Sequence, residues 1–311
     1  MPCACGAGHG RFCWRDFSPL SQAVVGAAVE FEKDAVAEDL ELLADFVADV
    51  AVSVASASSA SAIEVTHGRL RTMNQRQAVI EVMRQNSGYA TLGLLYKEAL
   101  KVPGVTWGTR TPFKSINRIV QDPRYFFRIR PGLWALKDSK NKLPPDLINK
   151  PRPQSEHSYY QGLLVELGNL RRQQTFVPKQ DRRRDFLGKP LGSIITVDDM
   201  YLFTYHEIVE SAARVDVVWF SERRFPSEFI EVENTTDMHG ALLKFVTLNP
   251  FHAVFRVVAP AARKREFESK VCHPSFDSIA KRTKFTSYDL VADLHRKASE
   301  SAALEHEWAD V

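Results

Sequence analysis

The stretch that most constrains this chain is a short apolar strand, residues 229–233, that carries two glutamates. Glu231 and Glu233 are two residues apart, and side chains alternate between the faces of a strand, so both are expected on one face. Ile230 and Val232 then point to the other face. Two neighbouring carboxylates repel each other and resist burial. A positive group is therefore expected beside them, and a divalent metal is the simplest candidate.

The flanking residues add a third carboxylate and a lysine. An apolar run at residues 215–219 predicts a preceding strand that carries Asp216. Polar residues at 235–237 predict the N-terminal cap of a following helix that contains Lys244. An alternative needs no ligand, because the three carboxylates could form structural ion pairs with arginines. The candidate partners are Arg214, Arg223 and Arg256.

Charge is unevenly distributed along the 311 residues, although the net charge is only +3. Residues 73–137 hold eleven Lys and Arg against three Asp and Glu, whereas residues 1–72 hold five against ten. A basic block of this kind is typical of a nucleic-acid-binding domain, although it is also compatible with a solvated basic face.

Residues 73–137 predict three helices followed by a β-hairpin. Thr111 is expected to cap the third helix, with Pro112 in its first position. A Pro-Gly turn at residues 131–132 joins the two strands. This order predicts a winged helix-turn-helix that contacts DNA through its third helix and its wing. The predicted DNA-binding residues are Lys114, Ser115, Asn117, Arg118 and Gln121 on the helix, and Arg128, Arg130 and Lys137 on the wing.

This block also resembles a known family, the HARE-type winged helix. The similarity lies in residues 89–92, 111–113, 119–122 and 130–136, of which the last is the wing motif. Members occur in chromatin proteins and fused to bacterial restriction-type endonucleases, which implies double-stranded DNA as a partner. The alternative is a small protein-interaction module.

Residues 1–72 are expected to be an acidic, low-complexity extension. An amphipathic helix is predicted from about residue 36 to 54, followed by an Ala/Ser-rich linker. The abrupt change of composition at Met73 leaves open that the chain natively starts there. Zinc binding by Cys3, Cys5, His9 and Cys13 lacks a recognised ligand spacing.

No apolar run is long enough to span a membrane, and no secretory signal is visible. Because the four cysteines form no disulfide framework, the cytoplasm is the expected location.

The C-terminal half predicts a second domain. The proline-rich residues 138–156 are expected to be a linker, residues 157–298 a domain, and residues 299–311 a frayed tail. Its helix, strand, acidic strand, acidic strand, helix and strand resemble the αβββαβ core of PD-(D/E)xK, or restriction endonuclease-like, nucleases. The resemblance implies an α+β or α/β fold with a mixed central sheet.

The resemblance also implies catalytic roles. Asp216 matches the aspartate of that family and Glu231 its first acidic position, so both are expected to bind Mg²⁺ or Mn²⁺. Glu233 stands where lysine is usual, as a further metal ligand or a general base. Lys244 is either a displaced catalytic lysine or a solvated helix residue. Glu166 matches an extra acidic residue on the first helix, and Gln180 is a candidate phosphate contact.

Together these features predict a Mg²⁺-dependent DNA endonuclease of a restriction or genome-defence system. A divalent cation would make the attacking water more acidic and face the charge that develops on the phosphate. A homodimer is compatible with cutting both strands, and no small-molecule cofactor is expected. Two alternatives remain: a DNA-binding regulator or adaptor whose nuclease-like domain no longer cuts, and a protein–protein scaffold.

Overall fold

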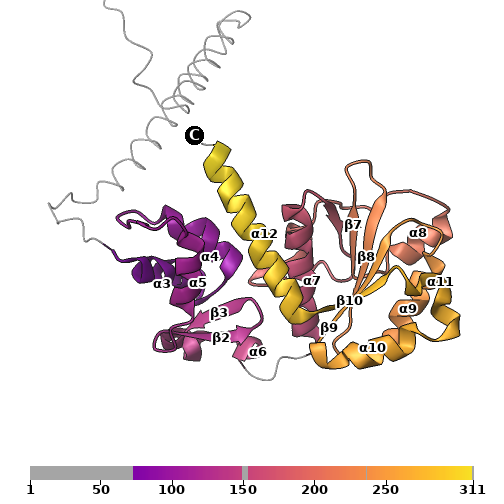
Figure 1. Cartoon of the computed structure of the whole chain (residues 1–311), viewed down its shortest axis with the longest axis horizontal. Helices are drawn as coiled ribbons and strands as arrows, with labels where there is room; N and C mark the ends of the chain where they lie inside the picture. The colour runs from indigo at the N-terminus through magenta and orange to yellow at the C-terminus, as the bar shows by residue number, and fades with distance from the viewer. Residues whose placement is uncertain (1–72, 149–152, 236, 310–311) are drawn as a thin grey trace, which may run out of the picture. The chain divides into compact units, whose positions relative to one another are not determined.

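The computed structural model describes residues 73–148, 153–235 and 237–309, which all belong to one compact unit spanning residues 70–311 (Figure 1). The N-terminal extension, with its acidic helix and its cysteines, lies outside the described residues. No helix in the described part of the chain is both long and apolar enough to cross a membrane.

Residues 73–137 form three helices and a small sheet, in the predicted order. The helices are α3 (Gln75–Gln85), α4 (Leu92–Glu98) and α5 (Pro112–Val120). An antiparallel sheet contains β1 (Tyr89–Thr91), β3 (Leu133–Leu136) and β2 (Phe126–Arg130), in that spatial order. Their apolar faces share one core that includes Val79, Leu95 and Ile116.

 The N-cap position of α5 is Thr111, as predicted, but its hydroxyl makes no hydrogen bond to the helix.

The stretch predicted as a linker, residues 138–156, is partly helical. It contains a 3₁₀ turn (Lys137–Lys142) and the short helix α6 (Pro145–Ile148). Leu143 is buried in a core that also contains Leu133 and Leu163, and this burial anchors the connection. The predicted linker thus contains short helical turns.

A five-stranded mixed sheet forms the centre of the second half. Its strands are β4 (Gln174–Phe176), β7 (Val217–Phe220), β8 (Pro226–Val232), β9 (Val254–Ala259) and β10 (Thr283–Ser287). The spatial order is β10-β9-β8-β7-β4. Strands β8, β9 and β10 are parallel neighbours, whereas β7 is antiparallel to both β8 and β4. A mixed sheet was predicted and is confirmed.

Helices cover both faces of this sheet (Figure 1). One face packs against α7 (Pro153–Leu170) and α12 (Tyr288–Ala309) in a core that includes Leu164, Ile230 and Val291. The other packs against α9 (Met238–Thr247), α10 (Lys264–Val271) and α11 (Asp277–Ala280), in a core that includes Phe229 and Phe245. The insertion between β4 and β7 holds the small ribbon β5 (Asp185–Phe186) and β6 (Lys189–Pro190), and helix α8 (His206–Ala212).

Two helices are longer than predicted. Helix α7 begins at Pro153, before the predicted domain start at residue 157, and α12 continues to Ala309, through the predicted frayed tail. Ala and Glu are good helix formers, and they are frequent after residue 298. Ser299 is buried and donates a hydrogen bond to the carbonyl of His295, so α12 is still packed at the start of this stretch, while Leu304 is half exposed.

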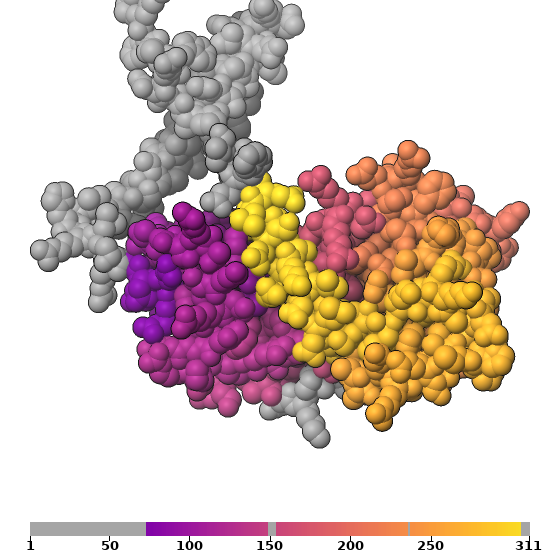
Figure 2. Space-filling view, viewed as in Figure 1, coloured from indigo at the N-terminus to yellow at the C-terminus, as the bar shows by residue number. Residues whose placement is uncertain are grey.

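Helix α12 lies between the first three helices and α7 (Figure 2). It crosses α4 at Gly93, where an added Cβ would lie 2.5 Å from Ser299 Oγ and 2.9 Å from His295 Cε1. Only a residue without a side chain fits this crossing without rearrangement. The close approach links the two halves of the described chain.

The turn between β2 and β3 packs against α7 and α12. Tyr159 on α7 donates a hydrogen bond of 2.9 Å to the carbonyl of Pro131. Gly132 has a φ of 81°, which glycine adopts readily, and a Cβ there would lie 3.1 Å from Ala292 Cβ on α12. The predicted wing is therefore in contact with the rest of the protein at its tip.

Candidate active site

The two acidic strands bring Asp216 and Glu231 together. Val217 pairs with Ile230 in the antiparallel register of β7 and β8, so Asp216, just before β7, lies opposite Glu231. Phe229 belongs to the core under α9, whereas Ile230 and Val232 belong to the core under α7. This confirms the predicted alternation of β8. Glu231 and Glu233 are both buried.

Lys244 reaches this strand from α9. Its Nζ lies 2.8 and 2.9 Å from the two carboxylate oxygens of Glu231 and 3.2 Å from the carbonyl of Arg214. The side chain of Glu231 is only 3% exposed, against 35% for that of Lys244. Lys244 is thus not a solvated helix residue but a partner of the first acidic position.

Electrostatic effects at this pair act in two directions. Burial first, and then the charge of Asp216, raise the pKa of Glu231 well above its usual value, although Lys244 opposes them. Burial alone would lower the pKa of Lys244, but Glu231 and then Asp216 outweigh it and raise that pKa. The contact of Nζ with both oxygens is that of an ammonium with an ionised carboxylate. A cation near Asp216 and Glu231 would relieve the repulsion between them.

Asp216 is held by two donors on the same oxygen. Its Oδ2 accepts a hydrogen bond of 2.8 Å from the backbone N–H of Val232 and lies 3.0 Å from Nε2 of His157 on α7. The structural ion pairs considered for the site carboxylates do not form with Arg256, whose partner is Glu228.

These side chains line one pocket of about 460 Å³. Gln180, the candidate phosphate contact, belongs to its lining. The residues that contribute acidic, basic or amide groups are Gln154, His157, Gln180, Asp181, Arg184, Asp216, Glu231, Glu233, Asn234, Asp237 and Lys244.

Glu233 lies beyond the end of β8, next to β9. Its backbone N–H donates to the carbonyl of Val258 at 2.8 Å, and its own carbonyl accepts a hydrogen bond of 3.0 Å from Arg263. Its charge also contributes, after the larger effect of Glu266, to raising the pKa of Arg263. Glu233 therefore lies between the pocket and a basic side chain.

Glu166 is not part of this pocket. It lies further along α7, and its Oε2 is 2.8 Å from Nε2 of His295 on α12. A different glutamate of α7 lies near the pocket, because Glu156 accepts a hydrogen bond of 2.8 Å from Asn234. Glu166 therefore faces α12 and not the pocket.

His157, Gln161, Asp181 and Arg184 were missed as site residues by the sequence analysis. A histidine and a glutamine four residues apart on a leucine-rich helix lie on one helical face, which is a usable signal. Asp181 and Arg184 lie in a polar insertion and carried no such signal. In the described part of the chain, no three His, Cys, Asp or Glu side chains form a ready-made metal cluster.

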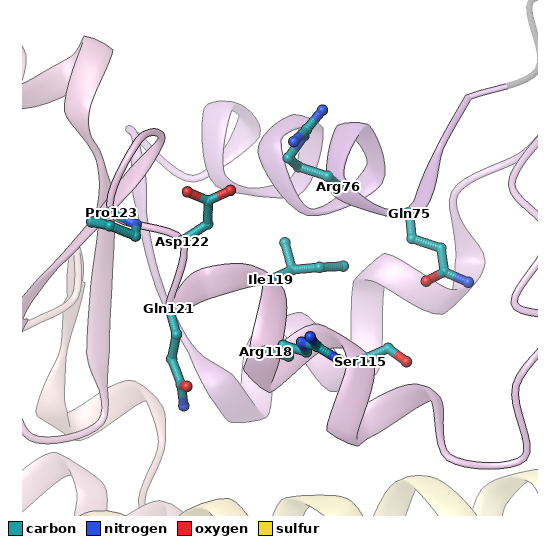
Figure 3. Close-up of a pocket in the computed structure, with 8 residues that line it drawn as sticks. All are labelled: Gln75, Arg76, Ser115, Arg118, Ile119, Gln121, Asp122 and Pro123. Carbon is teal, nitrogen blue, oxygen red and sulfur yellow. The ribbon is translucent and has the colours of Figure 1, made fainter.

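The predicted DNA-binding residues of α5 are at the surface. Lys114, Arg118 and Gln121 are exposed, and Ser115 and Asn117 are partly exposed. A pocket of about 560 Å³ lies between α3 and α5, with Ile119 between the helices and Arg76 and Arg118 at its sides (Figure 3). Arg76 and Arg118 form a basic rim on this pocket, which is compatible with the predicted contacts to phosphates.

The wing differs from the prediction. Arg130 is buried, its guanidinium lies 5.0 Å from the centre of the Tyr159 ring, and Nη1 lies 3.5 Å from the carbonyl of Ser155. Its expected exposure to DNA phosphates was wrong, because the hairpin tip packs on α7 and α12. Arg128 is half exposed and pairs with Asp289 at 3.2 Å, while Lys137 is exposed.

The fold and the pocket together define a mixed α+β protein with a buried carboxylate–lysine centre. A family model described as the type II restriction enzyme NmeDI C-terminal domain matches residues 142–308, which is more than half of the chain. The chain therefore belongs to this family and carries a domain of a type II restriction enzyme, consistent with a restriction endonuclease. Comparisons with curated proteins and with solved structures gave no match.

Proposed function

We propose that this protein is a metal-dependent endonuclease that hydrolyses phosphodiester bonds in double-stranded DNA. The observation that carries the proposal is the pocket in which Asp216, Glu231 and Lys244 meet, inside the region matched by the restriction-enzyme family. The order α7, β4, β7, β8, α9, β9 supports a restriction endonuclease-like core of the PD-(D/E)xK type. The departure from that motif is Glu233 in place of lysine.

The residues of the pocket fit Mg²⁺ or Mn²⁺. Both are hard cations that prefer carboxylate oxygen, and Mg²⁺ typically takes only one or two protein carboxylates while keeping several waters. Asp216 and Glu231 supply that number, and their mutual repulsion favours a cation. Bound there, the cation would supply Lewis-acid stabilisation of the charge that develops on the scissile phosphate.

Lys244 and Glu233 complete the proposed chemistry. Lys244 holds Glu231 in place and presents an ammonium to a phosphate that enters the pocket. Glu233 lies beside the same pocket, where it serves as a further ligand or as the base that takes a proton from the attacking water. Gln180, which lines the same pocket, is the candidate donor to a phosphate oxygen.

We also propose that residues 73–137 act as a winged helix-turn-helix that positions the DNA. Support comes from the three helices with their antiparallel sheet and from the exposed basic side chains of α5. Since the wing tip is packed, α5 and its rim with α3 carry the interaction. Action on DNA is compatible with a location in the cytoplasm and with a homodimer that cuts both strands.

A cleavage assay tests the proposed function. Plasmid DNA with different base modifications is incubated with the full chain and Mg²⁺ or Mn²⁺, and the wild type is compared with Asp216→Asn and Glu231→Gln. Cleavage that is abolished in both variants is expected, whereas Glu222→Gln, an exposed glutamate of the β7–β8 turn, should cut normally. Cleavage that survives both substitutions would exclude this pocket as the active site.

One observation favours a second candidate function, a DNA-binding regulator or adaptor that does not cut. Lys244 contacts both oxygens of Glu231, so this carboxylate has a cationic partner without any metal. Salt-dependent DNA binding with no cleavage of any plasmid, and no cation binding, would support this candidate.

A further inference from the structure

His157 is held between a carboxylate and a guanidinium at the edge of the candidate active site. Its Nε2 lies 3.0 Å from Asp216 Oδ2, and its Nδ1 lies 3.3 Å from Nη1 of Arg184. The side chains of His157 and Asp216 are 18% and 15% exposed, so water competes little for these contacts. Both ring nitrogens are engaged by protein groups.

The partners determine where the proton of the imidazole lies. A guanidinium has five N–H donors and no acceptor, so Arg184 can only donate to Nδ1. Nδ1 must then be the unprotonated nitrogen, and Nε2 carries the hydrogen. The Nε2–H group donates to Asp216 Oδ2, as a carboxylate can only accept. Because neither nitrogen has a lone pair directed at the pocket, His157 is not itself a metal ligand in this arrangement.

Arg184 is fixed in turn by a buried acidic residue. Its Nη2 lies 2.8 Å from Oδ1 of Asp181, which is only 2% exposed. Gln161, which is fully buried, donates 3.0 Å to Asp181 Oδ2 and 2.7 Å to the carbonyl of Asp216. The contacts therefore form a closed ring that begins and ends at Asp216.

The ring leaves one oxygen of Asp216 available. Oδ2 accepts from both His157 and the N–H of Val232, while Oδ1 takes no hydrogen bond from the described residues. Groups that hold a metal-binding carboxylate by hydrogen bonds commonly change metal affinity when they are removed. We propose that His157 is a positioning residue that orients Asp216 toward a divalent cation, and that Arg184 fixes the tautomer of His157. The inference rests on the proposed function.

Binding of Mn²⁺ to the full chain, measured by titration calorimetry, tests the role of His157 without relying on cleavage. His157→Ala should weaken Mn²⁺ binding about 10–100-fold. His157→Gln retains a terminal N–H donor and should recover most of the affinity. The matched control is His206→Ala, which removes an exposed histidine of α8 and should leave the affinity unchanged. Thermal unfolding confirms that each variant is folded.

A second measurement addresses the tautomer directly. The ¹⁵N chemical shifts of the His157 ring in the wild type should show a protonated Nε2 and an unprotonated Nδ1. Arg184→Ala should allow the other tautomer to appear and should weaken Mn²⁺ binding less than His157→Ala does. A wild-type ring protonated on Nδ1 would overturn the proposal.

The outcomes separate this inference from the proposed function. If the wild type binds Mn²⁺ and cuts DNA but folded His157→Ala binds Mn²⁺ equally well, the positioning role is wrong and the proposed function stands. If the wild type neither binds Mn²⁺ nor cuts DNA, both are wrong. If His157→Ala loses affinity and His157→Gln regains it, the positioning role is supported.

Discussion

At the residue scale, Lys244 supplies a positive charge that β8 itself lacks. In the proposed PD-(D/E)xK-type site, Glu233 stands where lysine is usual, and the ammonium comes instead from α9, thirteen residues after Glu231. Its ammonium contacts both oxygens of Glu231, so the charge occupies the same neighbourhood as a strand lysine would. The chemistry of the pocket thus depends on how β8 and α9 pack.

Removing this ammonium tests its role. Lys244→Met keeps the length of the side chain but leaves Glu231 buried beside Asp216 without its cationic partner. We expect kcat for plasmid cleavage to fall by on the order of 10²-fold, the loss seen when one stabilising donor of an active site is removed. Lys264→Met, at an exposed lysine of α10, should change cleavage little. Unchanged kcat in a folded Lys244→Met protein would make Lys244 a structural residue.

The raised pKa of Glu231 predicts a pH dependence of cation binding. Burial and the neighbouring Asp216 raise this pKa, so protons bind Glu231 at a pH at which an exposed glutamate would be ionised. Because a cation must displace that proton, Mn²⁺ affinity should weaken as the pH falls from neutral to mildly acidic. Calorimetry at several pH values measures this trend. Glu231→Gln should abolish the part of the dependence that belongs to this group, and a flat wild-type profile would contradict the prediction.

A surface pair in the α5 region gives an independent check of the electrostatics. Arg124 donates through its side chain and its backbone to Asp122 and lowers the pKa of that carboxyl to about 2. A lowered pKa stabilises the fold above the pKa of the unfolded chain, and the effect is lost as the pH falls toward the folded value. Arg124→Ala should move the pKa of Asp122 back toward its usual range, as measured by NMR titration. If the pKa of Asp122 stays low in Arg124→Ala, the backbone N–H of residue 124, and not the guanidinium, causes the lowering.

At the element scale, the sequence correctly predicted the features that depend on residues close together in the chain. The alternation of residues 229–233 gave the correct faces of β8, and the apolar period placed α3, α4 and α5. The prediction failed where long-range packing decides, as at the start of α7, the length of α12 and the buried wing tip. His157 contacts Asp216, and Arg184 contacts His157, only because α7 and a loop converge on β7, which one-dimensional patterns do not show.

The crossing of α4 and α12 should be sensitive to a single methyl group. Gly93→Ala would place a Cβ 2.5 Å from Ser299 Oγ, and overpacking of this kind typically costs about 1–3 kcal/mol. We expect a lower thermal midpoint than that of the wild type. Gly108→Ala, where no atom lies within 4 Å of the added Cβ, is the matched control. Ser299→Gly should recover part of the loss in the double variant, and equal stability of Gly93→Ala and the wild type would show that the helices adjust freely.

At the scale of the whole molecule, residues 73–137 and the region matched by the restriction-enzyme family share a packed junction. The wing tip, α7 and α12 meet through Tyr159, Gly132 and Ala292. His157, which contacts Asp216, lies on α7 only two residues before Tyr159. If residues 73–137 bind DNA as proposed, the basic surface that remains exposed for it is that of α5 and of the pocket rim that α5 shares with α3. This assignment is opposite to the initial expectation for the wing arginine Arg130.

The salt dependence of DNA binding distinguishes these surfaces. Each phosphate contact removed lowers the slope of log K against log salt by about one. Lys114→Ala and Arg118→Ala, which truncate exposed side chains of α5, should each show this reduction. Arg130→Met should leave the slope unchanged because its guanidinium is buried against Tyr159. Binding is measured on one duplex over a range of salt concentrations, with the Asp216→Asn chain, which is expected not to cut, as the common background. A reduced slope for Arg130→Met with wild-type slopes for both α5 variants would show that the wing, and not α5, faces the DNA.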